Sequence, residues 1–206
     1  MNLSTQLLLV IGICFLLQMF IPQFTEMFIF NPYLALSEPW RFVTSMFLHD
    51  GLMHIFFNAY ALFMFGSILE TQISRRDYLT IFFGAGLVGG VLYFLTTLGP
   101  WPPLCVQDST VVICSALGAS GAIFGILGAT AVMLPNLRIF FFFFPMKIRY
   151  AAILWVVLEL AGTFDISSGI ASAAHLGGLL FGLVFAWMIK RNMAHPQSWE
   201  WDTEFR

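Results

Sequence analysis

Long apolar stretches recur along this 206-residue chain and constrain its fold more than any other feature. A helix that crosses the hydrocarbon core of a bilayer needs about 20 mostly apolar residues. Hydropathy predicts six such spans, at about 6–21, 53–71, 78–98, 115–134, 150–163 and 170–189. Charged residues make up only 10% of the chain, against about a quarter in soluble domains. We therefore expect an all-α membrane protein with six transmembrane helices, a single domain over residues 1–206, with its core at about 6–191 and a short cytoplasmic tail at 192–206.

Positive charges lie in the connections that follow the second, fourth and sixth predicted spans. These cations are Arg75, Arg76, Arg138, Lys147, Arg149, Lys190 and Arg191. The connections on the other side hold Arg41 as their single cation. By the positive-inside rule, both termini are expected in the cytoplasm, with the chain multi-pass in the plasma (inner) membrane. The second, fourth and sixth spans then run from the outer surface inward.

Two connections are too apolar to be ordinary solvated loops. Residues 22–52 are rich in Phe, Met, Trp and Pro, which predicts a first loop that is partly embedded in the membrane. The run Phe140–Phe144, followed by Pro145, is too short to span and too apolar for water. We expect it to form a second interfacial segment, on the cytoplasmic side.

Composition argues against several functional classes. A net charge of -2 with dispersed cations gives no basic patch, so nucleic acid is not an expected partner. Cys14, Cys105 and Cys114 show neither metal-ligand spacing nor a CxxC pair, so no metal and no cofactor are expected. A disulfide between Cys105 and Cys114 stays open, because both lie on the predicted outer side. The sequence does not indicate an oligomeric state.

Four polar residues share a depth within the predicted spans. His54 and Asn58 lie in the first turns of the second span, while Ser120 and His175 each lie near the outer end of theirs. At ~1.5 Å rise per residue, Ser120 and His175 are expected roughly 8 Å below the outer boundary. Polar side chains are costly in a bilayer, so a shared depth makes these four the candidate functional group.

Glycines repeat beside the serine and the histidine. Gly121 lies at the start of a stripe on the fourth span, and Gly178 and Gly182 follow His175 on its own helix face. Small residues at this spacing let membrane helices pack closely, a pattern that is also common without any catalytic role.

A serine becomes a nucleophile when a base within hydrogen-bond reach accepts its proton, and imidazole suits this task at neutral pH. His175 is the expected base for Ser120. Taken without further motifs, a membrane serine can instead bond its own backbone, and a membrane histidine can serve packing or proton relay.

Five motifs, in order along the chain, give the pairing more specificity. They are Trp40-Arg41, the HxxxN pattern His54 to Asn58, Glu70 near the inner end of the second span, the GxSG pattern Gly118 to Gly121, and the AHxxGxxxG pattern Ala174 to Gly182. The chain resembles the rhomboid family of intramembrane serine proteases in all five. The resemblance covers all six spans and corresponds to the six-helix form.

The resemblance implies roles for these residues. Ser120 would be the nucleophile, and His175 the general base that later protonates the leaving amine. His54, Asn58 and the backbone N–H of Ser120 would form the oxyanion hole. The resemblance also implies that there is no acidic third member. The chain fits this expectation, since Glu159 is on another span and Asp165 is in the preceding loop, and an unpaired buried carboxylate would be costly.

Further residues depart from the family pattern or support it. Phe124 stands where relatives often carry a tyrosine stacked on the catalytic imidazole, so the stacking can persist without a hydroxyl. His49 matches a family histidine that we expect to organise the first loop or water access. For Trp40 and Arg41 we favour a structural role, anchoring to headgroups and to loop carbonyls, over substrate recognition.

The expected function is therefore an intramembrane serine endopeptidase that cleaves transmembrane segments of substrate proteins near the outer membrane face, working within the lipid bilayer. Two alternatives remain at this point. A rhomboid-like pseudoprotease would bind membrane proteins without cutting them, although such proteins typically lack the Ser or the His. A transporter could use His and Asn in a proton path, although no inverted repeat is visible. No HExxH and no pair of membrane aspartates indicates another intramembrane protease class.

Overall fold

The computed structural model describes residues 1–99, 102, 104–107, 110–141, 144–163 and 172–194. These residues are mostly helical, with two short antiparallel hairpins. The helices are α1 (Leu3–Phe20), α2 (Phe24–Phe28), α3 (Arg41–Thr44), η1 (Ser45–Phe47), α4 (Leu52–Ala61), η2 (Leu62–Gly66), α5 (Ser67–Glu70), α6 (Arg75–Thr97), α7 (Ser120–Met133), α8 (Ile148–Thr163) and α9 (Ser172–Ala194). The strands are β1 (Leu104–Gln107), β2 (Thr110–Ile113), β3 (Arg138–Phe141) and β4 (Phe144–Lys147).

Each apolar stretch of the sequence forms a helix close to its predicted range. Helices α4 and α5 join through η2, one π-helical turn, into a single run Leu52–Glu70. Four helices in the described part of the chain are long and apolar enough to cross a membrane: Leu3–Phe20, Leu52–Glu70, Arg75–Thr97 and Ser172–Met193. Helices α7 and α8, with 14 and 16 residues, are shorter than the about 20 residues of a typical span. The chain is therefore a multi-pass membrane protein.

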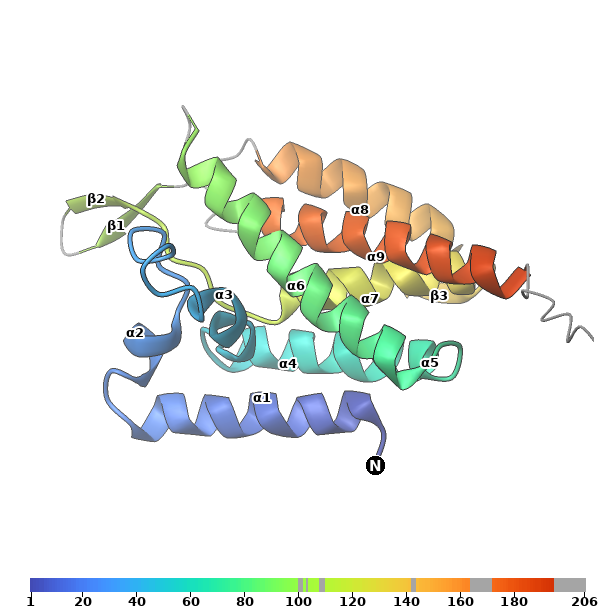
Figure 1. Cartoon of the computed structure of the whole chain (residues 1–206), viewed down its shortest axis with the longest axis horizontal. Coiled ribbons are helices and arrows are strands. Elements are labelled where there is room, and N and C mark those ends of the chain that lie inside the picture. Colours follow the sequence, from blue (N-terminus) through green and yellow to red (C-terminus); the bar gives the residue numbers. More distant parts are fainter. Residues whose placement is uncertain (100–101, 103, 108–109, 142–143, 164–171, 195–206) are drawn as a thin grey trace, which may run out of the picture.

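The helices form a bundle around α7, which packs against both α6 and α9 (Figure 1). Most of α7 is buried, including Ile126 and Thr130, both fully enclosed. A core cluster joins it to α1, to the α4–α5 run and to α6 through Ile11, Leu62 and Phe82. This central position makes α7 the frame from which Ser120 is presented.

The outer surface of the bundle is apolar rather than charged. Leu9 and Ile13 on α1, Phe56 and Phe63 in the Leu52–Glu70 run and Val184 on α9 are all more than half exposed. Large exposed apolar patches are rare on soluble monomers. On helices of this length they are the surfaces that contact lipid.

Glycines allow α7 and α9 to approach at backbone distance, as the glycine stripes predict. A Cβ atom at Gly178 would overlap the carbonyl oxygen of Gly121, and one at Gly182 would overlap the carbonyl oxygen of Gly125. These obstacles are backbone atoms, which cannot rotate aside. The close crossing therefore fixes the distance and angle between α7 and α9. It also fixes the positions of Ser120 and His175, which these helices carry.

Glu70 ties three helices together at one end of the bundle. Its carboxylate accepts hydrogen bonds from the backbone N–H groups of Leu3 and Ser4, at 2.6 and 3.2 Å. A carboxylate at a helix N-terminus satisfies free N–H groups and complements the helix dipole. The Ser4 hydroxyl also lies 2.9 Å from the Tyr78 hydroxyl on α6. Glu70 is thus a structural anchor.

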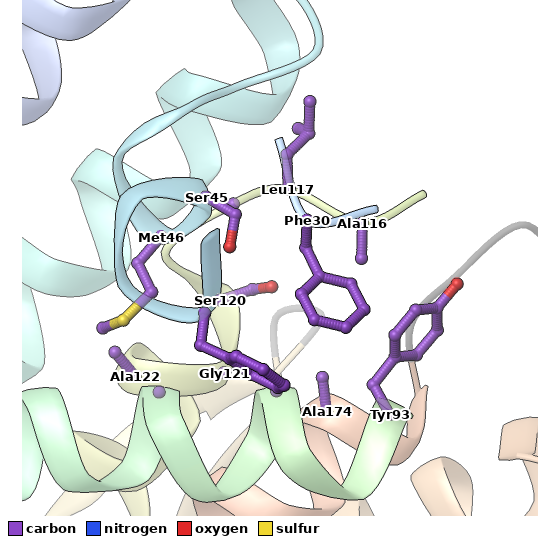
Figure 2. A pocket seen from close by; sticks show the side chains of 14 residues that line it. Phe30, Ser45, Met46, Tyr93, Ala116, Leu117, Ser120, Gly121, Ala122 and Ala174 are labelled. Atoms are coloured by element: carbon purple, nitrogen blue, oxygen red, sulfur yellow. The ribbon is translucent and has the colours of Figure 1, made fainter. Parts of the chain in front are cut away.

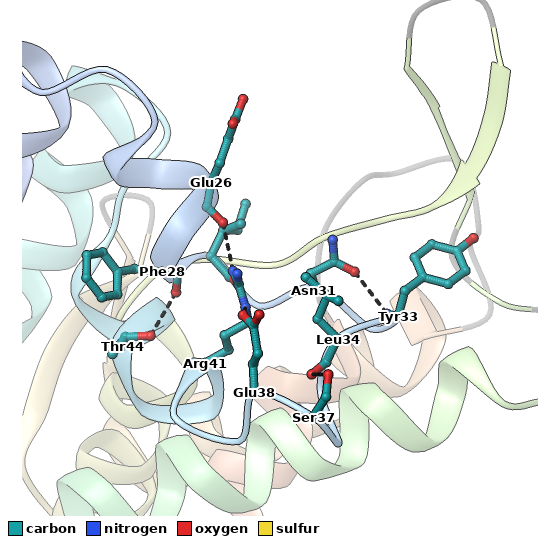
Figure 3. A network of polar contacts seen from close by, with 10 residues as sticks. Glu26, Phe28, Asn31, Tyr33, Leu34, Ser37, Glu38, Arg41 and Thr44 are labelled. Atoms are coloured by element: carbon teal, nitrogen blue, oxygen red, sulfur yellow. Dashed lines mark hydrogen bonds and ion pairs between the residues drawn. The ribbon is translucent and has the colours of Figure 1, made fainter.

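Arg41 organises the first loop from within (Figure 3). Its side chain is only 7% exposed, pairs with Glu38 at 2.5 Å, and donates to the carbonyl oxygens of Glu26 and Ile29 at 2.7 and 2.8 Å. The expected bonding to loop carbonyls is present. The expected anchoring of Arg41 to headgroups is wrong, because its donors are turned inward, whereas Trp40 is half exposed.

The chain enters α7 differently from the sequence expectation. The predicted span began at residue 115, but the helix begins at Ser120. Before it, Ala116 forms an isolated bridge with Phe30, and Gly118 has a φ of 123°. That left-handed conformation is open to glycine and cannot belong to a right-handed helix. Ser120 is therefore at the very N-terminus of its helix rather than five residues inside it.

Both hairpins fall in connections between helices. The predicted interfacial run Phe140–Phe144 lies in the β3–β4 hairpin, in which Phe140 and Phe144 are strongly exposed and residues 142–143 lie outside the described part. Cys114, which follows β2, is disulfide-bonded. The side chain of Cys105, the partner left open by the sequence, lies outside the described residues.

Candidate active site

Ser120 and His175 meet where the N-terminal ends of α7 and α9 lie together. The Ser120 hydroxyl oxygen lies 2.7 Å from Nε2 of His175, across 55 residues of sequence. A nucleophile and base within about 2.6–3.2 Å have the geometry for direct proton transfer. The shared depth inferred from hydropathy thus corresponds to a contact between the two side chains.

Phe124 holds the imidazole in place. The rings of Phe124 and His175 are stacked, with centroids 4.6 Å apart and planes inclined by 7°. The Trp155 ring of α8 makes an edge contact with Phe124, with the two ring centroids 6.3 Å apart. The phenyl ring therefore stacks on the imidazole as expected, and it offers no hydroxyl for a hydrogen bond.

Glu159 on α8 contacts the second nitrogen of the same imidazole. Its Oε1 lies 3.1 Å from Nδ1 of His175, and both side chains are 14% exposed. The expectation that no acidic side chain lies near His175 is therefore wrong. The sequence places the two residues on different predicted spans, and only the packing of α8 against α9 brings them together.

His54 points a ring nitrogen at the turn before Ser120. The backbone N–H of Asp50 donates to His54 Nδ1 at 3.3 Å, which leaves the proton on Nε2. A Cβ at Gly118 would lie 2.8 Å from His54 Nε2 and 3.7 Å from the Ser120 hydroxyl oxygen. An N–H donor, the nucleophile and a turn that requires glycine thus surround one small space.

Two further residues that line the same cleft have N–H groups available. Asn58 is 7% exposed and gives one amide N–H to the His54 carbonyl oxygen at 3.0 Å, so a second N–H remains. Ser120 is the first residue of α7, where backbone N–H groups have no partner within the helix and the helix dipole favours negative charge.

A cleft of about 930 Å³ reaches the serine, the imidazole that it contacts and the donors beside them. His54, Asn58, Ser120, Phe124 and His175 line it. A smaller cavity of about 40 Å³ adjoins Ser120, between Ser45 and Met46 on one side and the rings of Phe30 and Tyr93 on the other (Figure 2). Its volume suffices for a water molecule.

His49 is buried beside His54 but outside the cleft lining. It is 2% exposed, its ring lies 5.0 Å from that of His54, and neither of its ring nitrogens has a hydrogen-bond partner among the described residues. Its backbone N–H and carbonyl bond the Gln18 side chain, which connects the loop to α1. This supports the expected role of His49 in organising the first loop.

Burial makes His49 a source of pH-dependent stability. Desolvation, followed by the nearby His54, lowers the pKa of His49 from 6.5 to about 4. Below pH 6.5 the unfolded state binds a proton that the folded state does not, so stability falls as pH drops toward 4. The loss should reach on the order of 3 kcal/mol. Thermal unfolding of wild type and His49→Phe across this window should show a shallower pH dependence in the variant. Equal slopes would contradict the assignment.

Most of the predicted site residues come together, and the structure adds others. Gly118, Gly121, Gly178 and Gly182 shape the approach, whereas Trp40, Arg41 and Glu70 lie away from the cleft as supports. Sequence reasoning missed Glu159, Trp155 and the Ser45 carbonyl, which accepts from the Gly118 N–H at 2.9 Å. Within the described residues, no group of three potential ligands that could hold a metal is found.

Comparison with known proteins identifies a matching family model and several relatives of this chain. The family model described as Rhomboid domain matches residues 36–192. The rhomboid protease GluP of Bacillus subtilis is 32% identical over 157 residues, 76% of this chain and 27% of that protein. The putative rhomboid protease YdcA of the same organism is 29% identical, over 77% of this chain and 71% of that protein. Rhomboid protein 1, mitochondrial, of Saccharomyces cerevisiae is 28% identical, and the match spans 41% of its length.

Proposed function

This chain belongs to the rhomboid family, and from that membership and the geometry around Ser120 we propose that it is an intramembrane serine endopeptidase. The observation that carries the proposal is the 2.7 Å contact between the Ser120 hydroxyl and His175 Nε2 at the edge of an open cleft. A pseudoprotease has no need of such a contact. A proton path would need ionisable groups continuing across the bilayer.

The proposed reaction begins with His175 removing the Ser120 proton as the oxygen attacks the scissile carbonyl. The developing oxyanion would lie in the space beside Gly118. His54 Nε2–H, Asn58 and the Ser120 backbone N–H would donate to it, and such preorganised donors are usually the largest catalytic contribution. His175 then protonates the leaving amine, and water hydrolyses the acyl-enzyme.

The proposed membrane setting follows from where the charges and the cleft lie. The α5–α6 connection, the β3–β4 hairpin and the C-terminal end of α9 lie at one end of the bundle, and the first loop and β1–β2 lie at the other (Figure 1). The first end carries most of the cations, whereas Arg41 is in the first loop at the other end. The first end would therefore face the cytoplasm with both termini. The four long helices and the shorter α7 and α8 would all span the membrane, with the first loop partly embedded. Cleavage would then occur in the outer part of a substrate's membrane span, with the cleft open to outside water.

The test is cleavage of a transmembrane model substrate by the purified protein in proteoliposomes. The wild type should cut within or just beyond the outer part of the substrate span, as mapped by mass spectrometry of the products. An intact substrate, or cuts in the inner half of the span, would contradict the proposal.

Asn58→Ala should slow cleavage in this assay by about 10²–10³-fold, the usual effect of removing one oxyanion donor. The effect should fall on kcat rather than KM, because the oxyanion exists only in the transition state. Since Asn58 bonds its own helix, stability should change little. A variant that cleaves at the wild-type rate would remove Asn58 from the oxyanion hole.

A further inference from the structure

Glu159 lies where the acidic residue of a serine-protease triad would lie, on the far side of His175 from Ser120. None of the sequence motifs gives Glu159 a role. Its Oε1 is 3.1 Å from His175 Nδ1, opposite the nitrogen that contacts Ser120. We propose that Glu159 is a positioning residue that fixes the tautomer and orientation of His175, so that the chain works as a Ser–His–Glu system. This proposal rests on the proposed protease function and deepens it.

Helix α8 is built to place this carboxylate. Trp155 and Glu159 are one turn apart and therefore share a helix face. Trp155 lies against Phe124, whose ring stacks on His175, while Glu159 reaches the edge of the same imidazole. One face of α8 thus supports both the plane of the imidazole, through Phe124, and its Nδ1 edge.

The contact sets which nitrogen can act as the base. A carboxylate accepts hydrogen bonds only, so the proton of neutral His175 lies on Nδ1 and is donated to Glu159. Nε2 then carries the lone pair and accepts from the Ser120 hydroxyl. With the other tautomer, Nε2 would carry a proton and could not remove one from Ser120.

The carboxylate also faces the charge that forms during the reaction. As the bond from the Ser120 oxygen to the carbonyl carbon forms, the serine proton moves to Nε2 and the carbonyl electron pair moves onto its oxygen. The imidazolium then lies beside Glu159, which stabilises it without taking its proton. When the C–N bond breaks, Nε2–H gives its proton to the amine nitrogen. Both side chains are largely shielded from water, and this strengthens their interaction.

A purely structural alternative is that Glu159 only clasps α8 to α9. The two readings differ in what Glu159→Gln changes. Gln has the same shape but no charge, and its amide can present either an acceptor or a donor to Nδ1. A contact that only joins α8 to α9 would be partly kept by Gln, whereas Gln would not fix the tautomer of His175.

The experiment compares wild type, Glu159→Gln and Glu159→Asp in proteoliposomes, with Leu158→Ala as a control on the same helix, since Leu158 is 51% exposed. Cleavage kinetics give kcat and KM, thermal unfolding gives stability, and ¹⁵N NMR in micelles reports the His175 tautomer. We expect Glu159→Gln to lower kcat by about 10²–10⁴-fold with little change in KM. Glu159→Asp should recover part of the loss, Leu158→Ala should match wild type, and wild-type His175 should carry its proton on Nδ1.

Three results would overturn the proposal. The first is a kcat for Glu159→Gln equal to that of the wild type. The second is a neutral His175, in the wild-type protein, that carries its proton on Nε2. The third is a fall in kcat that is equal in the Gln and Asp variants and is explained by their lost stability. The tautomer is measured on the wild type, so the test stands even where a variant does not fold. The protease proposal fails separately, if Ser120→Ala cleaves as the wild type does.

Discussion

Alanine at Ser120 or at His175 is expected to lower the rate of substrate cleavage by about 10⁴-fold or more while the protein stays folded. In serine proteases, removing the nucleophile or the base costs this much or more, because neither half of the pair acts without the other. The two losses should therefore not add: the double variant should be about as slow as either single one. Cleavage in proteoliposomes, with thermal unfolding of each variant, measures both effects.

A matched control for this pair is Ser37→Ala. Ser37 is an exposed serine of the first loop whose hydroxyl donates to the Leu34 carbonyl, away from the cleft. It should cleave at the wild-type rate. Losses that multiply in the double variant would mean that Ser120 and His175 act independently, which the 2.7 Å contact does not allow.

Gly182→Ala is expected to destabilise the fold and to abolish most activity although it adds one methyl group. The new Cβ would overlap backbone atoms of Gly125, so α7 and α9 must separate. Overpacking a close-packed interior costs about 1–3 kcal/mol, and a rigid backbone obstacle places this variant at the upper end. The separation would also pull His175 from Ser120, so cleavage per folded molecule should fall. Denaturant unfolding in detergent, combined with the cleavage assay, separates the two losses.

Gly12→Ala on α1 gives the matched control for that change. Apart from its chain neighbours and the local backbone of its own helix, no atom lies within 4 Å of a Cβ at this position. Alanine should therefore leave activity unchanged and stabilise the helix, by up to about 1 kcal/mol in the soluble-helix scale. If Gly182→Ala were as stable and active as Gly12→Ala, the close crossing of α7 and α9 would not be what positions the site.

Much of this fold can be predicted from the sequence because a bilayer restricts which segments of a chain can cross it. Hydropathy locates each long helix to within a few residues, since a membrane helix must be both long and apolar. The shared depth expected for His54, Ser120 and His175 comes from span limits and charge alone. These are properties of single helices, and a single sequence records them directly.

What the sequence does not predict depends on contacts between helices or on local backbone geometry. Glu159 contacts His175 because of how α8 is turned about its axis against α9. The sequence of an apolar helix has no polar–apolar periodicity that would reveal this orientation. Arg41 turns inward because carbonyls of Glu26 and Ile29 converge on it. The late start of α7 follows from the positive φ of Gly118, although the GxSG pattern marks the position.

Covalent labelling shows whether His175 makes Ser120 a nucleophile. A fluorophosphonate probe is added to the wild type and to His175→Ala, and the modified residue is located by peptide mass spectrometry. We expect a single phosphonylated serine, Ser120, in the wild type, and labelling slowed by orders of magnitude in His175→Ala. Modification at another serine, or equal labelling of Ser120 in both proteins, would contradict it.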